Sequence, residues 1–425
     1  MWTAHPLKES MEKKKVVIIG GGFAGINVAR RLTNPHLDVL LLDKKNHHLF
    51  QPLLYQVASA TLSPADIAFP LREILKNHKN ASVLMGEVTR IDKNAKKVYL
   101  PHSELSYDYL VVATGARHSY FGNDKWEQHA PGLKTLVDAL SIREHILLSF
   151  EKAERLDDPQ EIEKHLTFVI IGGGPTGVEM AGAIAEIAHS TLLKNFRKIE
   201  PSKAQILLVE AAPRILPPYP PSLSARAQKD LESMGVKVLI NTKVVDITEE
   251  GVKTDQSFLS SKNIIWAAGN QASALLKTLD TPLDRQGRAV VEPDLSLPNH
   301  PEIFVIGDAA CCMNKKGIPL PAVATAAIQQ GAYLGKLLNK QVPKEKRKPF
   351  KYFDKGSLAT IGRAKAVGFF NGFTFSGFFA WIIWAFIHIV YLVGFRNRYA
   401  VLLEWYFHYI SGARGARLIH RSIDQ

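Results

Sequence analysis

Cysteine is almost absent from this chain of 425 residues, and the two that occur, Cys311 and Cys312, are adjacent. Adjacent cysteines exclude a disulfide framework, and their scarcity indicates a reducing compartment. They also lack the C-x-x-C spacing of a dithiol redox pair. The fifteen histidines show no metal-ligand spacing, and His47-His48 is expected in a loop, so we expect no metal site.

An export signal is also missing. Residues 1–15 are polar and charged without an apolar core, so they resemble a disordered leader rather than a signal peptide. We therefore expect the protein to stay in the cytoplasm. The pattern leaves open whether Met1 or Met11 is the start.

Two glycine-rich loops are the strongest signals present. Each follows a short apolar strand and opens a helical stretch. The first glycine of G-x-G-x-x-G permits the tight turn, the second lets backbone approach a pyrophosphate, and the third lets helix pack on strand. The motif glycines are Gly20, Gly22 and Gly25 in the first loop, and Gly172, Gly174 and Gly177 in the second.

Each loop is followed by a strand that ends in an acid. Asp43 comes 18 residues after Gly25, and Glu210 comes 33 residues after Gly177. Carboxylates at these places accept ribose hydroxyls, and Glu210 would repel a 2′-phosphate, which predicts NADH rather than NADPH. The longer second spacing predicts an extended helix and loop over residues 186–203. Alternatively, both acids are surface charges at strand ends.

A third signal is the pair of turns that follow two further apolar strands. Their residues are Thr114 and Gly115 in an A-T-G turn, and Gly307 and Asp308 in a G-D turn. The set resembles the flavoprotein superfamily with two dinucleotide-binding domains. That resemblance implies non-covalent FAD in the first domain, with Asp308 at its ribityl–pyrophosphate region. It also implies NADH in the second, inserted domain, where Gly269 completes the expected cofactor-binding residues.

The expected fold class is therefore α/β, with two Rossmann-like domains and a C-terminal helical region that attaches to a membrane. We expect the FAD-binding domain at 13–120 and 285–340, the NADH-binding domain at 121–284, and the membrane-attachment region at 341–425.

The C-terminal quarter combines positive charge with a long apolar run. Residues 331–425 hold fifteen Lys or Arg against four Asp or Glu, whereas the whole chain has a net charge of +13. Residues 366–395 contain none of these four types. Nucleic-acid binding would explain the charge alone, but it would leave the apolar run unexplained.

The helical wheel of this run separates two faces. One face carries Trp381, Trp384, His388 and Tyr391, and the other is mostly aliphatic. With Arg396 and Arg398 following, this pattern is typical of a helix lying in the bilayer interface, attracted to anionic lipid. A membrane-spanning helix and a buried core or dimer helix are the alternatives.

With these features together, the chain resembles the type II NADH:quinone oxidoreductases, which are single-subunit, non-pumping respiratory enzymes. The likeness runs from about residue 14 to 419 and includes the segments 47–58, 172–179, 354–366 and 414–419. It implies electron transfer from NADH through FAD to a membrane quinone. It also implies a homodimer held peripherally on the cytoplasmic face of the inner membrane.

The family's quinone signature, A-Q-x-A-x-Q, is altered here. Thr325 stands where the first Gln is expected, and Gln329 matches the second. Gln329 could donate to a quinone carbonyl, whereas the alanine-rich spacing alone would indicate a packed helix. Lys365 is expected either to stabilise a quinol anion or to lie among lipid headgroups.

Quinone reduction also needs protons. Glu179, two residues after Gly177, is expected to donate or relay one. Its alternative role is that of a first-turn acid at the positive end of a helix.

Rival functions remain at this stage. A sulfide:quinone reductase needs well-separated reactive cysteines, and a reductase of ferredoxin or rubredoxin would lack the apolar tail. A nucleotide-sensing membrane scaffold would transfer no electrons.

Overall fold

The computed structural model describes residues 13–412 and 414–420, so most of the predicted leader lies outside the described residues. The chain divides into two compact units. Unit 1 comprises residues up to His48, 69–117 and 271–354, and unit 2 comprises 49–68, 118–270 and the chain from Lys355 onward. The main segment of unit 2 is thus inserted between segments of unit 1. The four predicted domain ranges stay a prediction.

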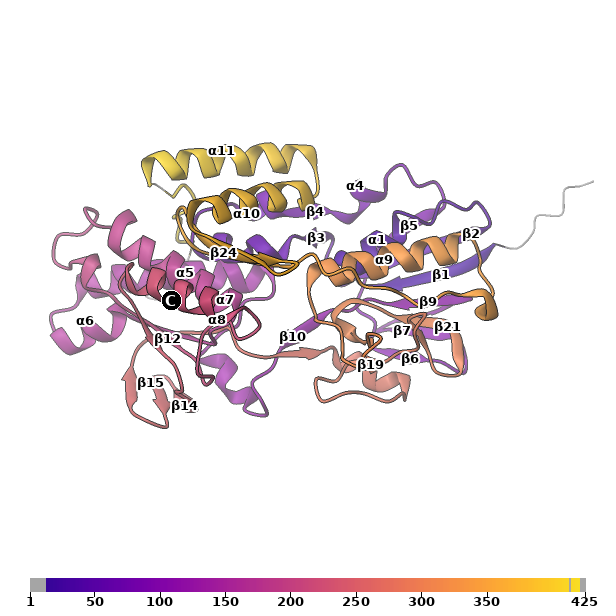
Figure 1. The fold of residues 1–425 in the computed structure, drawn as a ribbon, viewed down its shortest axis with the longest axis horizontal. Coiled ribbons are helices and arrows are strands. Elements are labelled where there is room, and N and C mark those ends of the chain that lie inside the picture. The colour runs from indigo at the N-terminus through magenta and orange to yellow at the C-terminus, as the bar shows by residue number, and fades with distance from the viewer. Residues whose placement is uncertain (1–12, 413, 421–425) are drawn as a thin grey trace, which may run out of the picture. The chain divides into compact units, whose positions relative to one another are not determined.

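Unit 1 is built on a six-stranded sheet in the order β20-β21-β9-β1-β2-β5. Its strands pair in parallel except for β20 with β21. The strands are β1 (Lys14–Ile19), β2 (Leu37–Asp43), β5 (Ala81–Met85), β9 (Tyr109–Val112), β20 (Ser296–Leu297) and β21 (His300–Val305). Helices α1 (Phe23–Ala29) and α9 (Ala324–Asn339) contact each other beside this sheet (Figure 1). The aliphatic central strands and these helices form one apolar core.

The smaller elements of unit 1 contribute buried residues to the same core. They are β6 (Arg90–Asp92), β7 (Lys97–Leu100) and β8 (Ser103–Ser106), which form an antiparallel sheet, with α4 (Leu71–Leu75), β19 (Ala289–Val290) and β22 (Ala310–Cys311). The predicted loop at His47-His48 is wrong, because His47–Leu49 form strand β3. The His48 ring is buried and its Nδ1 lies 2.9 Å from the carbonyl oxygen of Gly21, a partner 27 residues away that local spacing does not indicate.

Unit 2 has a four-stranded parallel sheet in the order β13-β12-β11-β17. The strands are β11 (Thr167–Ile171), β12 (Gln205–Val209), β13 (Val236–Leu239) and β17 (Asn263–Trp266). Its helices include α2 (Leu54–Ala58), α3 (Pro64–Ile67), α5 (Leu136–Arg155), α6 (Pro159–Leu166), α7 (Pro175–Glu186) and α8 (Pro221–Glu232). The predicted long connection after α7 contains a π-helical turn, η3 (Ile187–Thr191), and a 3-10 turn, η4 (Pro201–Lys203). A small antiparallel sheet holds β14 (Val244–Thr248), β15 (Gly251–Thr254) and β16 (Phe258–Ser260).

The C-terminal part of unit 2 ends in the predicted helices, and a small sheet that the sequence did not indicate precedes them. Three antiparallel strands come first, namely β23 (Ser357–Gly362), β24 (Lys365–Phe370) and β25 (Phe373–Ser376). They lead to α10 (Gly377–Tyr391) and α11 (Phe395–Ser411), drawn in yellow tones in Figure 1. The charge-free run therefore covers most of a strand pair as well as a helix.

The aromatic face of α10 packs inward. Trp384 is buried, and its ring lies 5.0 Å from that of Trp405 on α11. The other face of α10 is exposed, with Phe379 and Phe386 among its residues. Arg398 donates to the carbonyl oxygens of Val390 and Leu392, and so caps the end of α10. Among the described residues, each helix is too short or too polar to cross a membrane.

Candidate active site

The first glycine loop, in unit 1, has the geometry that its sequence predicts. Gly20 has φ +106°, and a Cβ there would lie 2.3 Å from the Ala113 carbonyl oxygen. A Cβ at Gly22 would meet open space. Asp43 ends β2, and its carboxylate accepts from the backbone N–H of Gly21 at 2.6 Å. The acid is therefore held against the loop.

The two turns of unit 1 also suit a bound dinucleotide. Among the described residues, the buried Thr114 hydroxyl has no hydrogen-bond partner, and Gly115 borders open space. The backbone N–H of Gly307 donates to the Gln330 side chain at 2.6 Å, which fixes the start of the short turn that carries Asp308. An orphaned hydroxyl and an open glycine cradle fit FAD.

The second loop, in unit 2, repeats this construction. Gly172 has φ +111°, and Gly174 again borders open space. Glu210 follows β12 and accepts from the Gly173 and Ala212 N–H groups at 2.6 and 2.7 Å. Gly269 has a different local reason for lacking a side chain, because a Cβ there would lie 2.7 Å from the Phe121 ring.

Two predicted catalytic side chains form hydrogen bonds with neighbouring protein groups. On α9, the Gln329 amide donates to the Phe353 carbonyl oxygen at 2.8 Å and accepts from the Phe353 N–H at 3.0 Å. Thr325 lies on the same helix, and its hydroxyl is 3.2 Å from that of Tyr352. Lys365, on β24, donates to the Ser233 hydroxyl at 2.8 Å. A quinone contact for Gln329 or Lys365 stays a prediction.

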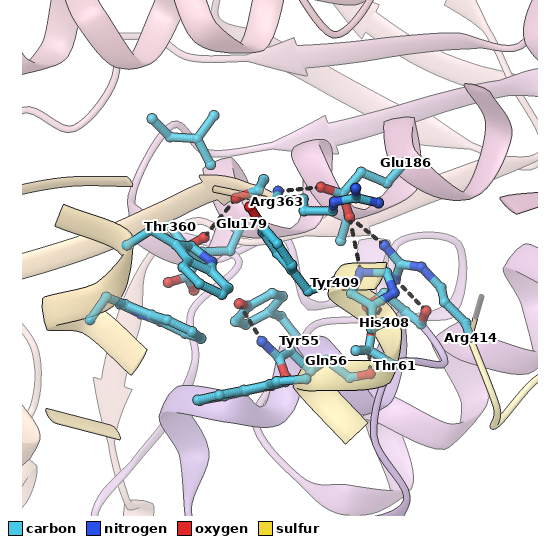
Figure 2. Close-up of a pocket in the computed structure, with 17 residues that line it drawn as sticks. Tyr55, Gln56, Thr61, Glu179, Glu186, Thr360, Arg363, His408, Tyr409 and Arg414 are labelled. Carbon is cyan, nitrogen blue, oxygen red and sulfur yellow. Dashed lines mark hydrogen bonds and ion pairs between the residues drawn. The ribbon is translucent and has the colours of Figure 1, made fainter. Parts of the chain in front are cut away.

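A cavity in unit 2 is lined by the third predicted catalytic residue, Glu179, and by a set of polar and aromatic side chains (Figure 2). Its volume is about 50 Å³, which leaves room for about two water molecules at roughly 30 Å³ each. We call it the inner cavity. The side chains that line it come from α2, α7, β23, α10, α11 and the segment after α11, and they include Tyr55, Glu179, Glu186, Trp384, His408 and Arg414.

Glu179 is the fifth residue of α7, beyond its first turn, which argues against the helix-end role. Its carboxylate accepts from the backbone N–H of Thr360, and burial raises its pKa well above the ordinary value. A raised pKa favours the protonated carboxyl group, which is the form that can act as an acid.

Glu186 lies seven residues further along α7, on the same face of the helix. Its Oε2 accepts from Arg414 at 2.7 Å and lies 3.7 Å from His408 Nε2. Burial alone would raise the pKa of Glu186, but His408, Arg414 and the Arg363 N–H together hold it below its ordinary value. Figure 2 shows these side chains converging on Glu186. The sequence reasoning missed this cluster, although the i, i+7 spacing of the two glutamates was a visible signal.

Gly182 makes these contacts possible. A Cβ at this position would lie 1.7 Å from the Ile361 carbonyl oxygen, so β23 runs directly against α7. The N–H groups of Thr360 and Arg363, on either side of Ile361, thereby reach Glu179 and Glu186.

The remaining polar contacts tie the C-terminal segment to α2. Trp405 donates to the Gln56 side chain at 2.7 Å, and Gln56 donates to the Tyr55 hydroxyl at 2.8 Å. Arg414 donates to the Ser59 carbonyl oxygen and the Thr61 hydroxyl. Arg414 belongs to the terminal motif noted in the sequence, where it carried no assigned role.

Comparisons with known proteins are consistent along the chain. Residues 14–331 match the pyridine nucleotide-disulphide oxidoreductase family, and residues 355–413 match the NDH2 C-terminal domain. The type II NADH:quinone oxidoreductase NdhA of Mycobacterium tuberculosis is 44% identical, over 96% of this chain and 89% of its own. Ndh of the same organism, also a type II NADH:quinone oxidoreductase, is 43% identical, over 97% and 91%.

Solved structures show the same fold. NDH2 from Plasmodium falciparum in complex with NADH has a TM-score of 0.88 at 22% identity, covering 95% of this chain and 99% of that one. The sulfide:quinone oxidoreductase of Aquifex aeolicus has a TM-score of 0.72 at 19% identity, covering 91% and 92%. At these identities the likeness concerns the fold alone.

Replacing Gly182 by alanine should destabilise unit 2. Alanine gains about 1 kcal/mol of helix propensity, but overpacking costs about 1–3 kcal/mol. The added carbon would also push β23 away from two buried carboxylates, so we expect a net loss of stability. The thermal unfolding midpoint should fall, whereas that of Lys229→Ala, an exposed change on α8, should stay near the original value. An unchanged midpoint in Gly182→Ala would contradict the close α7–β23 contact.

Proposed function

This chain belongs to the type II NADH:quinone oxidoreductase family, and on that premise we propose that it reduces a membrane quinone with NADH and uses Glu179 as the proton donor. The observation that carries the proposal is the placement of Glu179. Its carboxyl group faces a cavity, has a raised pKa caused by burial, and lies on the helix that opens from the second glycine loop.

The residues of unit 1 would hold FAD. The N–H groups and open glycines of the first loop would receive its pyrophosphate, and Asp43 its ribose hydroxyls. Thr114 and Asp308 would contact the rest of the cofactor. Bound FAD supplies the redox group that links a two-electron donor to a quinone.

NADH is the substrate of the second loop. Its pyrophosphate would lie at the N-terminus of α7, where backbone N–H groups favour negative charge. Glu210 would accept the ribose hydroxyls and exclude a 2′-phosphate by repulsion. Its two backbone hydrogen bonds keep this carboxylate at the loop before substrate arrives.

The overall reaction takes up one proton, because NADH, one proton and quinone give NAD⁺ and quinol. Glu179 would deliver that proton to a quinone oxygen and recover it from the medium. We propose Lys365 as a group that steadies the developing negative charge. For Gln329 we propose a hydrogen bond to a quinone carbonyl, which requires its amide to leave the Phe353 backbone.

Cysteine-dependent alternatives find little support. Cys311 and Cys312 are buried, and burial raises the pKa of both thiols, that of Cys312 to about 11. Neither thiol is therefore activated as a nucleophile at neutral pH. A sulfide:quinone reductase or a disulfide reductase needs such a thiolate.

We further propose that α10 and α11 dock on the cytoplasmic face of the inner membrane as a peripheral attachment. The support is the outward aliphatic and aromatic face of both helices, which includes Phe379, Ile382, Phe386, Tyr406 and Phe407. Exposed apolar surface of this extent indicates a partner. The net positive charge of the region suits anionic lipid. A homodimer is proposed from family resemblance.

Replacing Glu179 by glutamine tests the catalytic proposal. NADH oxidation with a short-chain quinone should fall by about two orders of magnitude, the usual contribution of a general acid. NADH oxidation with ferricyanide, an acceptor that takes electrons without protons, should change little. In the unmodified protein, the quinone rate should fall as pH rises through the raised pKa of Glu179, since the donor must be protonated.

The unmodified protein is the control for this measurement. A protein that reduces ferricyanide but ignores quinone would refute the proposed acceptor. Equal loss with both acceptors in Glu179→Gln would show that the residue does not act in proton delivery.

Glu210→Gln tests the nucleotide preference. The neutral amide no longer repels a 2′-phosphate, so the ratio of kcat/KM for NADPH to that for NADH should rise about tenfold, equivalent to about 1.4 kcal/mol. The change is read from steady-state rates with both nucleotides. Glu200→Gln, an exposed acid on the loop before β12, is the matched control. An unchanged ratio would mean that Glu210 does not meet the ribose.

Membrane docking is tested with Ile382→Glu and Phe386→Glu combined. Each charge opposes burial of the helix face in lipid, so co-flotation with vesicles of anionic phospholipid should be largely lost. Phe258→Glu changes an exposed Phe on β16 and should float as the unmodified protein does. If the double variant still floats, α10 is not the docking surface.

A further inference from the structure

A second cavity lies on the far side of the Glu186 cluster. We call it the outer cavity; its volume is about 230 Å³. Glu186, Arg363 and His408 line both cavities, and we call these three shared residues the wall. The other residues that line the outer cavity are Ser190, Thr191, Met234, Lys365 and Gly412.

We propose that this wall is the proton inlet of the enzyme: His408, oriented by Glu186, takes protons from the outer cavity and passes them through water in the inner cavity to Glu179. The inference rests on the proposed role of Glu179 and extends it to the path by which that residue is reprotonated. One proton enters per quinone reduced, and the two electrons come from NADH.

The dimensions suit a short chain of water. Glu179 and Glu186 are seven residues apart on one helix, which is about 10 Å at 1.5 Å per residue. Waters at hydrogen-bond spacing of about 2.8 Å cover this distance with roughly three molecules. The inner cavity has room for about two of them, and the Tyr55 hydroxyl, which also lines it, is a further group through which a proton can pass.

The charges near Glu186 determine which side chain can carry a proton. Among the described residues, the charged and titratable groups near Glu186 are His408 from α11, Arg414 from the C-terminal segment, Arg363 from the β23–β24 turn, Tyr55 from α2, and Lys365 from β24 in the outer cavity. Arg414 is buried and permanently charged, so it cannot carry protons. Glu186 is held ionised by its partners. His408 carries an imidazole, whose two ring nitrogens can take up a proton on one side and release one on the other.

The arrangement also favours movement of the proton toward Glu179. Glu179 lies at the other end of the inner cavity, where burial makes its anion costly and its protonated form favoured. Tyr55 accepts from Gln56, so its own hydroxyl proton is available to donate into the cavity.

Two replacements test the inlet, His408→Asn and Glu186→Gln. In both, quinone reduction by NADH should fall by about tenfold or more and acquire a larger solvent deuterium isotope effect, because proton delivery becomes limiting. Ferricyanide reduction should stay within about twofold of the original rate. Added imidazole should restore quinone reduction in His408→Ala through the outer cavity.

Glu404→Gln is the matched control, because it removes a carboxylate one turn earlier on α11, away from both cavities. Ser190→Trp tests the inlet with His408 and Glu186 intact, since the indole narrows the outer cavity. This variant should lose quinone reduction and keep ferricyanide reduction, and it remains informative if the charge variants do not fold.

The outcomes separate the two proposals. If Glu179→Gln loses quinone reduction while His408→Asn, Glu186→Gln and Ser190→Trp keep it with an unchanged isotope effect, the inlet is refuted and the donor stands. Loss of both acceptor activities in the wall variants would also overturn the inlet, because it would indicate a structural role. An unmodified protein that ignores quinone would refute the proposed function itself.

Discussion

The contact between the backbone of β23 and Gly182 of α7 is the constraint on which the site depends. A strand backbone brought this close to a helix offers its N–H groups directly to side chains on the facing helix surface. Glu179 and Glu186 each accept one of these donors, so the same contact positions both carboxylates. A larger residue at Gly182 would separate the two elements, which is why a glycine is required in the middle of a helix despite its cost in helix propensity.

The two carboxylates show how neighbours decide the state of buried acids. Both suffer desolvation, which disfavours the charged form. Glu186 has Arg414 and His408 within reach, and their attraction outweighs the desolvation. Glu179 has one backbone N–H, which does not. One helix face therefore carries two acids, two turns apart, whose pKa values are shifted in opposite directions.

The sequence predicted what local backbone geometry controls and missed what distant segments create. The glycine loops and the acids Asp43 and Glu210 were predicted, since a tight turn after a strand restricts residue choice within a few positions. The hydrogen bonds of Gln329 to Phe353 and the cluster around Glu186 join residues 24 to 228 positions apart, and such partners leave no trace in local spacing. Strands β24 and β25 were missed because their apolar residues merged with those of α10 into one run.

The orientation of α10 follows from the same competition between polar and apolar surroundings. Its Trp and His residues face the protein, where Trp384 packs against Trp405 and the His388 ring finds a backbone carbonyl on its own helix. Its aliphatic face is left without protein cover, and in water this would forfeit about 25 cal/mol for each Å² of apolar surface. A helix whose polar groups face the protein and whose hydrocarbon groups face outward is the reverse of a helix that faces water. A lipid surface removes the cost, because the exposed side chains then leave water as completely as core residues do.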